Sequence, residues 1–337
     1  MELLKQILKN SKKVDEKFIG LDEKNLERIR LIFNVPSFHP RFKKIKKYPL
    51  FFSKIEKLNE IPIYKKSKNK IFLIDKSVSN LKFIREFIKN NKIKPIVIKS
   101  IENKTKTKDF VDKLVQRKEF KKEDSLIVVL GGGLLINIGA YLAESISSKL
   151  ILLPSTVLSM ADGSGGKVRI NIIDKKKAYK HYFKSYYEPN MILLDKRFLD
   201  SLPKTQVKIG LVEIIKHGLF QSSSLYNYIL KNKNSLFSDK RKLMKIILWA
   251  QDLKRICMEV DVEENENGSK RILRGGHDFS DRLEEGQNLT IPHGFAVSIG
   301  IIMQLKKDKK SEFLKKANKI FNAFKIPKTL KEFKNLK

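Results

Sequence analysis

The chain has 337 residues, enough for two domains that each bury a core, and its apolar fraction of 41% excludes wholesale disorder. The single cysteine, Cys257, excludes an internal disulfide framework or a cysteine-rich zinc finger. Met1–Lys17 lacks the apolar core of a secretory signal. These features together predict a cytoplasmic protein.

The formal net charge of +34 is the most unusual bulk property of the chain. A basic excess can indicate a nucleic-acid-binding surface. Here the cations are mostly lysines spread along the whole sequence, without an arginine-rich tract. We therefore interpret the charge as a lysine-rich background and predict no nucleic-acid partner, although such a field also attracts phosphorylated substrates.

The first part of the chain predicts a basic helical extension over residues 1–47, followed by an α/β domain over residues 48–200. In this second region short apolar runs alternate with helical spacing, which is typical of a parallel sheet covered on both faces. The predicted strands are Lys70–Asp75, Lys94–Lys99, Leu126–Leu130 and Lys149–Leu153, and the helices between them include Leu81–Lys92 and Lys108–Lys118.

One segment, Ser125–Ala143, is long and uncharged enough to suggest a membrane span. Its central glycine triplet and the polar Asn137 favour instead a buried strand, a tight turn and the start of a helix. We therefore predict no membrane association.

Residues 201–337 are predicted to form a mostly helical second domain. The expected helices are Gln206–Phe220, Leu225–Lys231, Lys240–Glu259, Phe279–Glu284 and Phe295–Lys306. The predicted fold class is thus α/β, with a Rossmann-like parallel-sheet domain followed by a helical domain.

The glycine triplet Gly131–Gly133 lies between a predicted strand and a predicted helix. Glycines there permit a tight turn, and the free N–H groups of the helix start can bind a phosphate. Asp75 ends another strand, where a carboxylate can bind an adenosine ribose. Two alternatives stay open: a turn without a ligand, and Asp75 as a helix N-cap.

A candidate metal site comes from three separated segments. Glu213 and Lys216 are three residues apart in GLVEIIKHG and so share a helix face, while His277 and His293 stand beside glycines. Two imidazoles and one carboxylate would form a three-ligand divalent site with open positions, which is the catalytic arrangement. The alternative is a pair of unrelated polar histidines.

These segments together resemble 3-dehydroquinate synthase and related sugar-phosphate cyclases, from about Tyr48 to Lys306. The resemblance rests on LIVVLGGGLLINIGAY, on the turn Pro154–Thr156, on MADGSGGKVRIN with Lys167 and Asn171, on MILLDKRFLDSLP, on GLVEIIKHG, and on the glycine-flanked His277 and His293.

The resemblance implies that Glu213, His277 and His293 hold one divalent metal, zinc or else cobalt. It implies an NAD site at Asp75, Gly131, Gly132, Gly133, Leu134, Leu135, Asn137, Ser155, Thr156, Lys176, Phe198 and Ser201. The catalytic and substrate-facing residues would be Lys167, Lys177, Lys216 and Arg274. A homodimer is also expected.

The activity that the resemblance implies is the closure of a C7 sugar phosphate to a carbocycle. NAD would take and return a hydride around phosphate elimination, and an intramolecular aldol step would follow. A metal- and NAD-dependent polyol or glycerol-phosphate dehydrogenase of the same architecture is one alternative. An inactive or nucleic-acid-binding relative is the other.

The chain departs from the family pattern near the expected phosphate. Asp281 stands where the family has a histidine, and Lys177 and Arg274 replace asparagines. Tyr179–Tyr187 has no family equivalent. Asp281 would repel a phosphate, whereas Lys177 and Arg274 would attract one. We therefore predict weak or absent turnover of the shikimate-pathway heptulosonate phosphate and better turnover of a differently shaped sugar phosphate such as a sedoheptulose.

Overall fold

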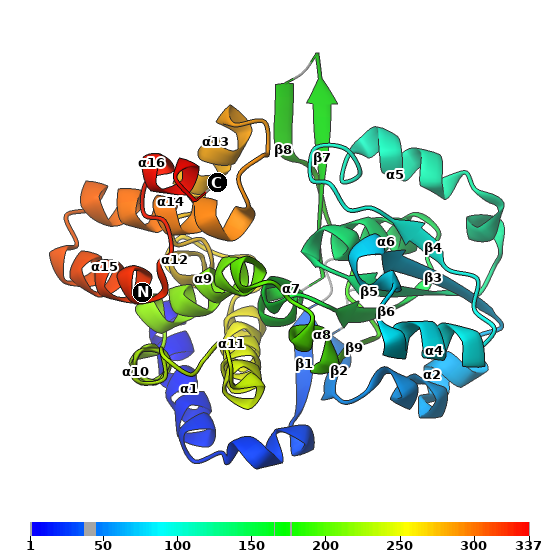
Figure 1. The fold of residues 1–337 in the computed structure, drawn as a ribbon, viewed down its shortest axis with the longest axis horizontal. Coiled ribbons are helices and arrows are strands. Elements are labelled where there is room, and N and C mark those ends of the chain that lie inside the picture. The colour runs from blue at the N-terminus through cyan, green and yellow to red at the C-terminus, as the bar shows by residue number, and fades with distance from the viewer. Residues whose placement is uncertain (1, 37–44, 165, 176, 337) are drawn as a thin grey trace. The chain divides into compact units, whose positions relative to one another are not determined.

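The computed structural model describes residues 2–36, 45–164, 166–175 and 177–336 (Figure 1). The chain divides into two compact units. The sheet unit is Glu27–Ser201, and the helical unit is Met1–Leu26 together with Leu202–Lys337. The sequence prediction placed the corresponding boundary between residues 200 and 201.

The sheet unit is built on a seven-stranded sheet with the order β1-β2-β9-β6-β5-β3-β4. All neighbouring pairs are parallel except β1 with β2. The four strands predicted from apolar runs are confirmed. The strands are β1 (Arg30–Pro36), β2 (Ile45–Phe52), β3 (Asn69–Asp75), β4 (Ile96–Ile98), β5 (Ser125–Gly131), β6 (Lys149–Pro154) and β9 (Met191–Leu194).

Helices connect and cover these strands, as the alternating pattern predicts (Figure 1). They are α2 (Pro62–Lys66), α3 (Lys76–Ser79), α4 (Lys82–Asn90), α5 (Lys108–Val115), α6 (Gly133–Ser145), α7 (Val157–Asp162) and α8 (Arg197–Asp200), with 3-10 helices η2 (Ile55–Glu60) and η3 (Lys118–Lys121). Strand β5 is buried along its whole length and leads into α6 through the glycine triplet. None of the helices in the described ranges combines the length and apolarity that a membrane span needs.

Helix α6 packs closely against β5 at Gly139. A Cβ atom added to Gly139 would lie 2.2 Å from Cγ2 of Val129. We therefore expect Gly139→Ala to lower the free energy of unfolding by about 1–3 kcal/mol through overpacking. Denaturant unfolding would measure this loss. The double variant with Val129→Ala should recover part of it, and a Gly139→Ala protein of unchanged stability would contradict the packing described.

An antiparallel hairpin of β7 (Lys167–Asp174) and β8 (Lys177–Tyr186) stands apart from the main sheet (Figure 1). Most of β8 lies in Tyr179–Tyr187, the segment predicted to have no family equivalent, and it forms half of this hairpin. The N–H of Arg169 ties the hairpin to α6 by donating to Oδ1 of Asn137 at 2.7 Å. Within the hairpin, the N–H of His181 donates to Oδ1 of Asn171 at 2.9 Å.

Helix α9 (Lys204–Phe220) lies at the centre of the helical unit and is buried from Val207 onward at most positions. It packs against α10, α11, α12, α14 and α15. The other helices are α1 (Glu2–Ile19), α10 (Ser223–Lys231), α11 (Lys240–Val260), α12 (Lys270–Leu273), α13 (His277–Gly286), α14 (His293–Lys307), α15 (Ser311–Phe324) and α16 (Leu330–Lys334); the 3-10 helix η1 (Glu23–Arg28) contains the unit boundary.

The described residues in the predicted extension, 2–36 and 45–47, are part of the two compact units. Helix α1 packs on α11, where Nε1 of Trp249 donates to Oδ1 of Asp15 at 2.9 Å. At the end of α9, Nε2 of Gln221 donates to Oγ of Ser11 at 2.9 Å. Strands β1 and β2 belong to the main sheet. These contacts were not predicted because the partners lie far along the chain, where local patterns carry no information about them.

Candidate functional site

Helix α9 places Glu213 and Lys216 side by side in the helical unit. Both side chains are only 2% exposed, and Nζ of Lys216 donates to Oε2 of Glu213. The same ammonium donates to the carbonyl of Leu273 at 2.7 Å. The second carboxylate oxygen, Oε1 of Glu213, is buried and has no hydrogen-bond partner within the described ranges.

Two histidines converge on that oxygen. His277 is the first residue of α13, and His293 is the first residue of α14. Their Nε2 atoms lie 3.9 Å and 3.7 Å from Oε1 of Glu213. One ligand atom from each of the three residues can be chosen so that all lie within 4.8 Å of one another. The structure thus brings together the three predicted metal ligands.

The other ring nitrogens face hydrogen-bond acceptors. Nδ1 of His293 lies 2.8 Å from Oε1 of Glu284, and Nδ1 of His277 lies 3.3 Å from the carbonyl oxygen of Gly275. Acceptors at Nδ1 favour the tautomer with its proton there, so each Nε2 lone pair is available on the side of Glu213. Glu284 was absent from the sequence prediction, because its contact with His293 depends on how α13 and α14 cross.

These donors fit a divalent metal. One carboxylate oxygen and two imidazole nitrogens suit zinc and neighbouring first-row ions, and three protein ligands leave positions open for substrate. A buried carboxylate oxygen without a partner is costly, and a cation beside Oε1 of Glu213 would satisfy it.

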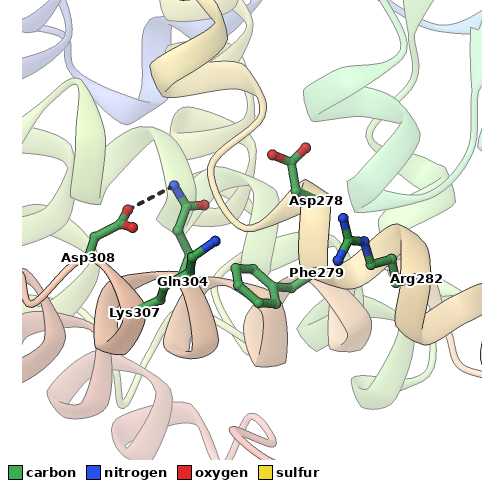
Figure 2. A pocket seen from close by; sticks show the side chains of 6 residues that line it. All are labelled: Asp278, Phe279, Arg282, Gln304, Lys307 and Asp308. Atoms are coloured by element: carbon green, nitrogen blue, oxygen red, sulfur yellow. Dashed lines mark hydrogen bonds between the residues drawn. The ribbon is translucent and has the colours of Figure 1, made fainter.

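The turn before His277 requires glycine. Gly276 has a φ of +78°, and a Cβ atom there would lie 2.5 Å from the backbone nitrogen of Ile301. Its N–H donates to Oε1 of Gln304 on α14 at 2.6 Å. Figure 2 shows Gln304 in a pocket on α13 and α14 whose lining residues are Asp278, Phe279, Arg282, Gln304, Lys307 and Asp308.

Arg274 and Asp281 form an ion pair. Nη2 of Arg274 donates to Oδ1 of Asp278 at 3.0 Å and to Oδ2 of Asp281 at 3.3 Å. Asp281 was predicted to repel phosphate, and Arg274 was predicted to face the substrate. The structure adds that one guanidinium is shared by the carboxylates of Asp278 and Asp281, so its charge only partly offsets theirs.

In the sheet unit, the carboxyl ends of β3, β5 and β6 bring several predicted NAD residues together. The N–H of Ser155 donates to the carbonyl of Gly131 at 2.9 Å. A Cβ atom on Gly131 would lie 3.1 Å from that of Asp75, and one on Gly132 would lie 3.3 Å from Cγ2 of Thr156. Gly132 is the N-cap residue of α6, so the strand–turn–helix expectation holds.

Two of the predicted NAD residues, Asp75 and Asn137, make local hydrogen bonds at the starts of α3 and α6. Oδ1 of Asp75 accepts from N and Oγ of Ser77, at 2.8 Å and 2.6 Å, so Asp75 caps α3 as the alternative reading held. Nδ2 of Asn137 donates to the carbonyl of Gly133 at 2.9 Å. Leu135 is fully buried and Leu134 is half-buried.

The remaining predicted residues lie elsewhere in their units. Phe198 is buried on α8, with its ring 5.2 Å from that of Phe83, and Oγ of Ser201 donates to its carbonyl at 3.0 Å. Lys167 opens β7, and Lys177 opens β8. Lys176 lies outside the described residues.

Comparison with known proteins identifies the family. Residues 96–209 match the 3-dehydroquinate synthase N-terminal family, and residues 210–335 match the 3-dehydroquinate synthase C-terminal family. A 3-dehydroquinate synthase of Saccharolobus solfataricus is 30% identical over 256 residues, which are 75% of this chain and 70% of that protein. A 3-dehydroquinate synthase of Sulfurisphaera tokodaii is 31% identical over 197 residues, which are 58% of this chain and 54% of that protein. The match therefore spans about half of the length of the Sulfurisphaera protein.

Solved structures share the fold at lower identity. The 2-epi-5-epi-valiolone synthase of Streptomyces hygroscopicus, solved with NAD+ and Zn2+, has a TM-score of 0.72 at 19% identity and covers 85% of this chain and 82% of its own. A 2-deoxy-scyllo-inosose synthase solved with carbaglucose-6-phosphate, NAD+ and Co2+ has a TM-score of 0.69 at 21% identity. The match covers 90% of this chain and 84% of that protein. On the matches to both family domains and to the Saccharolobus protein, the chain belongs to the 3-dehydroquinate synthase family.

Proposed function

We propose that this protein is a 3-dehydroquinate synthase-like sugar-phosphate cyclase that uses NAD and one divalent metal, zinc or cobalt. The observation that carries the proposal is the convergence of His277 and His293 on the unpartnered oxygen of Glu213, in a chain of this family. Two structural neighbours were solved with NAD+ and with Zn2+ or Co2+, which supports the choice of cofactors.

In the helical unit, Glu213, His277 and His293 would hold the metal. A divalent metal bound there supplies a Lewis acid that polarises a substrate hydroxyl. Lys216 holds the second oxygen of Glu213, which keeps the carboxylate oriented and partly offsets its charge. The imidazoles are presented through Nε2 because their Nδ1 atoms face acceptors.

In the sheet unit, we propose that the turn Gly131–Gly133 and the start of α6 bind the pyrophosphate of NAD. The first N–H groups of a helix are free to donate to an anion, and the helix dipole favours negative charge there. Bound NAD would accept a hydride from the substrate and return it, so that phosphate elimination and aldol closure proceed without net oxidation.

A glycine substitution at this turn tests the NAD site. A Cβ atom on Gly133 would meet no protein atom within 4 Å, so Gly133→Ala should fold normally and disturb only a bound ligand. We expect Gly132→Val to weaken NAD binding at least about tenfold, since a side chain blocks close approach of the backbone, and Gly133→Ala to weaken it less.

Calorimetric titration with NAD measures both effects. Gly286→Ala, at another open glycine position on α13, serves as the control and should bind NAD as the unmodified protein does. Unchanged affinity in Gly132→Val and Gly133→Ala proteins that remain folded would place NAD elsewhere.

The substrate we propose is a C7 sugar phosphate, with the heptulosonate phosphate of 3-dehydroquinate synthase as the first candidate. The prediction of weak turnover stays open to the assay, because Arg274 is shared by Asp278 and Asp281 and offsets the charge of Asp281 only in part. Elemental analysis of the purified protein, followed by phosphate-release assays on a panel of sugar phosphates, tests the proposal. Absence of bound metal and of phosphate release from every member would contradict it.

A metal- and NAD-dependent dehydrogenase is the second candidate. An iron-containing alcohol dehydrogenase shares the fold with a TM-score of 0.56 at 16% identity. That likeness concerns the fold alone, whereas the family matches favour the cyclase.

A further inference from the structure

Both metal-site histidines stand at the first position of a helix, His277 on α13 and His293 on α14. The start of a helix has unpaired backbone N–H groups and is held less firmly than its middle. Both imidazoles nevertheless have to present Nε2 to the same oxygen of Glu213. The two helices pack against each other, and side chains late in each helix reach the beginning of the other.

The first of these side chains is Glu284, near the end of α13. It is 2% exposed, and its Oε1 lies 2.8 Å from Nδ1 of His293 at the start of α14. A carboxylate there fixes the rotation and tautomer of the ring and strengthens Nε2 as an electron-pair donor.

The second is Gln304, near the end of α14. Its Oε1 accepts from the N–H of Gly276 at 2.6 Å, one residue before His277. On the other side of the amide, Nε2 of Gln304 donates to Oδ2 of Asp308 at 3.5 Å (Figure 2). Gly276 is also tightly packed against Ile301, so α14 determines where α13 begins.

We propose that Glu284 and Gln304 are reciprocal positioning residues, each holding from one helix the metal-binding histidine at the start of the other. The inference rests on the proposed metal centre. It extends that centre by two residues that neither the sequence motifs nor the three-ligand geometry contains.

The test is zinc affinity of the full-length protein, measured by competition with a chromophoric chelator. We expect Glu284→Ala to bind zinc about 10–100-fold more weakly, the range typical for loss of a residue that orients a metal ligand. Glu284→Gln retains an acceptor for Nδ1–H without the charge and should recover part of the loss. Gln304→Ala should weaken zinc binding about tenfold, while Met303→Ala, its exposed neighbour, should leave it unchanged.

Cobalt absorption spectra and melting of the metal-free proteins complete the test. If Glu284 and Gln304 position the histidines, replacing either residue should alter the visible spectrum of bound Co2+, because the ligand field depends on how the imidazoles are oriented. Zinc affinity within twofold of the unmodified protein in both alanine variants would overturn the inference, even if their melting temperatures fall. Failure of the unmodified protein to bind zinc would instead contradict the proposed metal centre itself, and the inference with it.

Discussion

Replacing Lys216 by methionine should lower the free energy of unfolding of the metal-free helical unit by about 3–5 kcal/mol, the usual cost of leaving one partner of a buried ion pair uncompensated. Both side chains of the pair are 2% exposed, so water cannot take over the role of the ammonium beside Glu213. The hydrogen bond from Lys216 to the carbonyl of Leu273 is lost as well.

Zinc should reverse most of this loss. A divalent cation beside Oε1 of Glu213 compensates the buried carboxylate, so the variant should gain more stability from zinc than the unmodified protein does. Denaturant unfolding followed by fluorescence of Trp249, the single tryptophan, reports on the helical unit in chelator and in zinc.

The matched control is Lys204→Met, at the exposed first turn of the same helix. It should unfold as the unmodified protein does. If Lys216→Met is equally stable with chelator, or if zinc leaves its stability unchanged, then the coupling of Lys216 to the metal ligand is wrong.

Replacing either metal-site histidine should abolish stoichiometric metal binding. Each would supply one of the three proposed ligands, and a site with two ligands loses the geometry on which tight zinc binding depends. We expect His277→Ala and His293→Ala to contain almost no zinc by elemental analysis after dialysis. His181→Asn, a histidine of the hairpin with a φ of +54° that asparagine tolerates, should retain the full amount.

A substitution of the third ligand separates metal loss from fold loss. Glu213→Gln should also lose zinc, but it leaves the buried Lys216 ammonium without its carboxylate and so should unfold more easily than either histidine variant. Full zinc content in all three variants would show that Glu213, His277 and His293 do not form the metal site.

The fold was predictable where the signal is local. Strands such as Leu126–Leu130 are continuous apolar runs because parallel strands are covered on both faces. The hairpin was missed because β8 (KAYKHYFKSY) mixes lysines, tyrosines and other polar residues without a continuous apolar face that a pattern could detect. The association of α1 with α11 was missed because the contact between Asp15 and Trp249 joins residues far apart in sequence.

The site was predictable where a motif is compact. GLVEIIKHG and the glycine-flanked histidines indicated the three metal-site residues that the structure brings together. Their supports were hidden, because the contact between Glu284 and His293 depends on how two helices cross. The pairing of Arg274 with Asp281 was hidden for the same kind of reason, since it depends on how the start of α13 turns.

The most direct test of the central claim is the ratio of phosphate released to NAD supplied, with a C7 heptulosonate phosphate as substrate and zinc present. A cyclase returns the hydride in every cycle, so we predict many equivalents of inorganic phosphate per NAD, no accumulation of NADH, and loss of both metal and phosphate release in His293→Ala. Accumulation of NADH in proportion to substrate consumed, without phosphate release, would contradict the cyclase and identify a dehydrogenase.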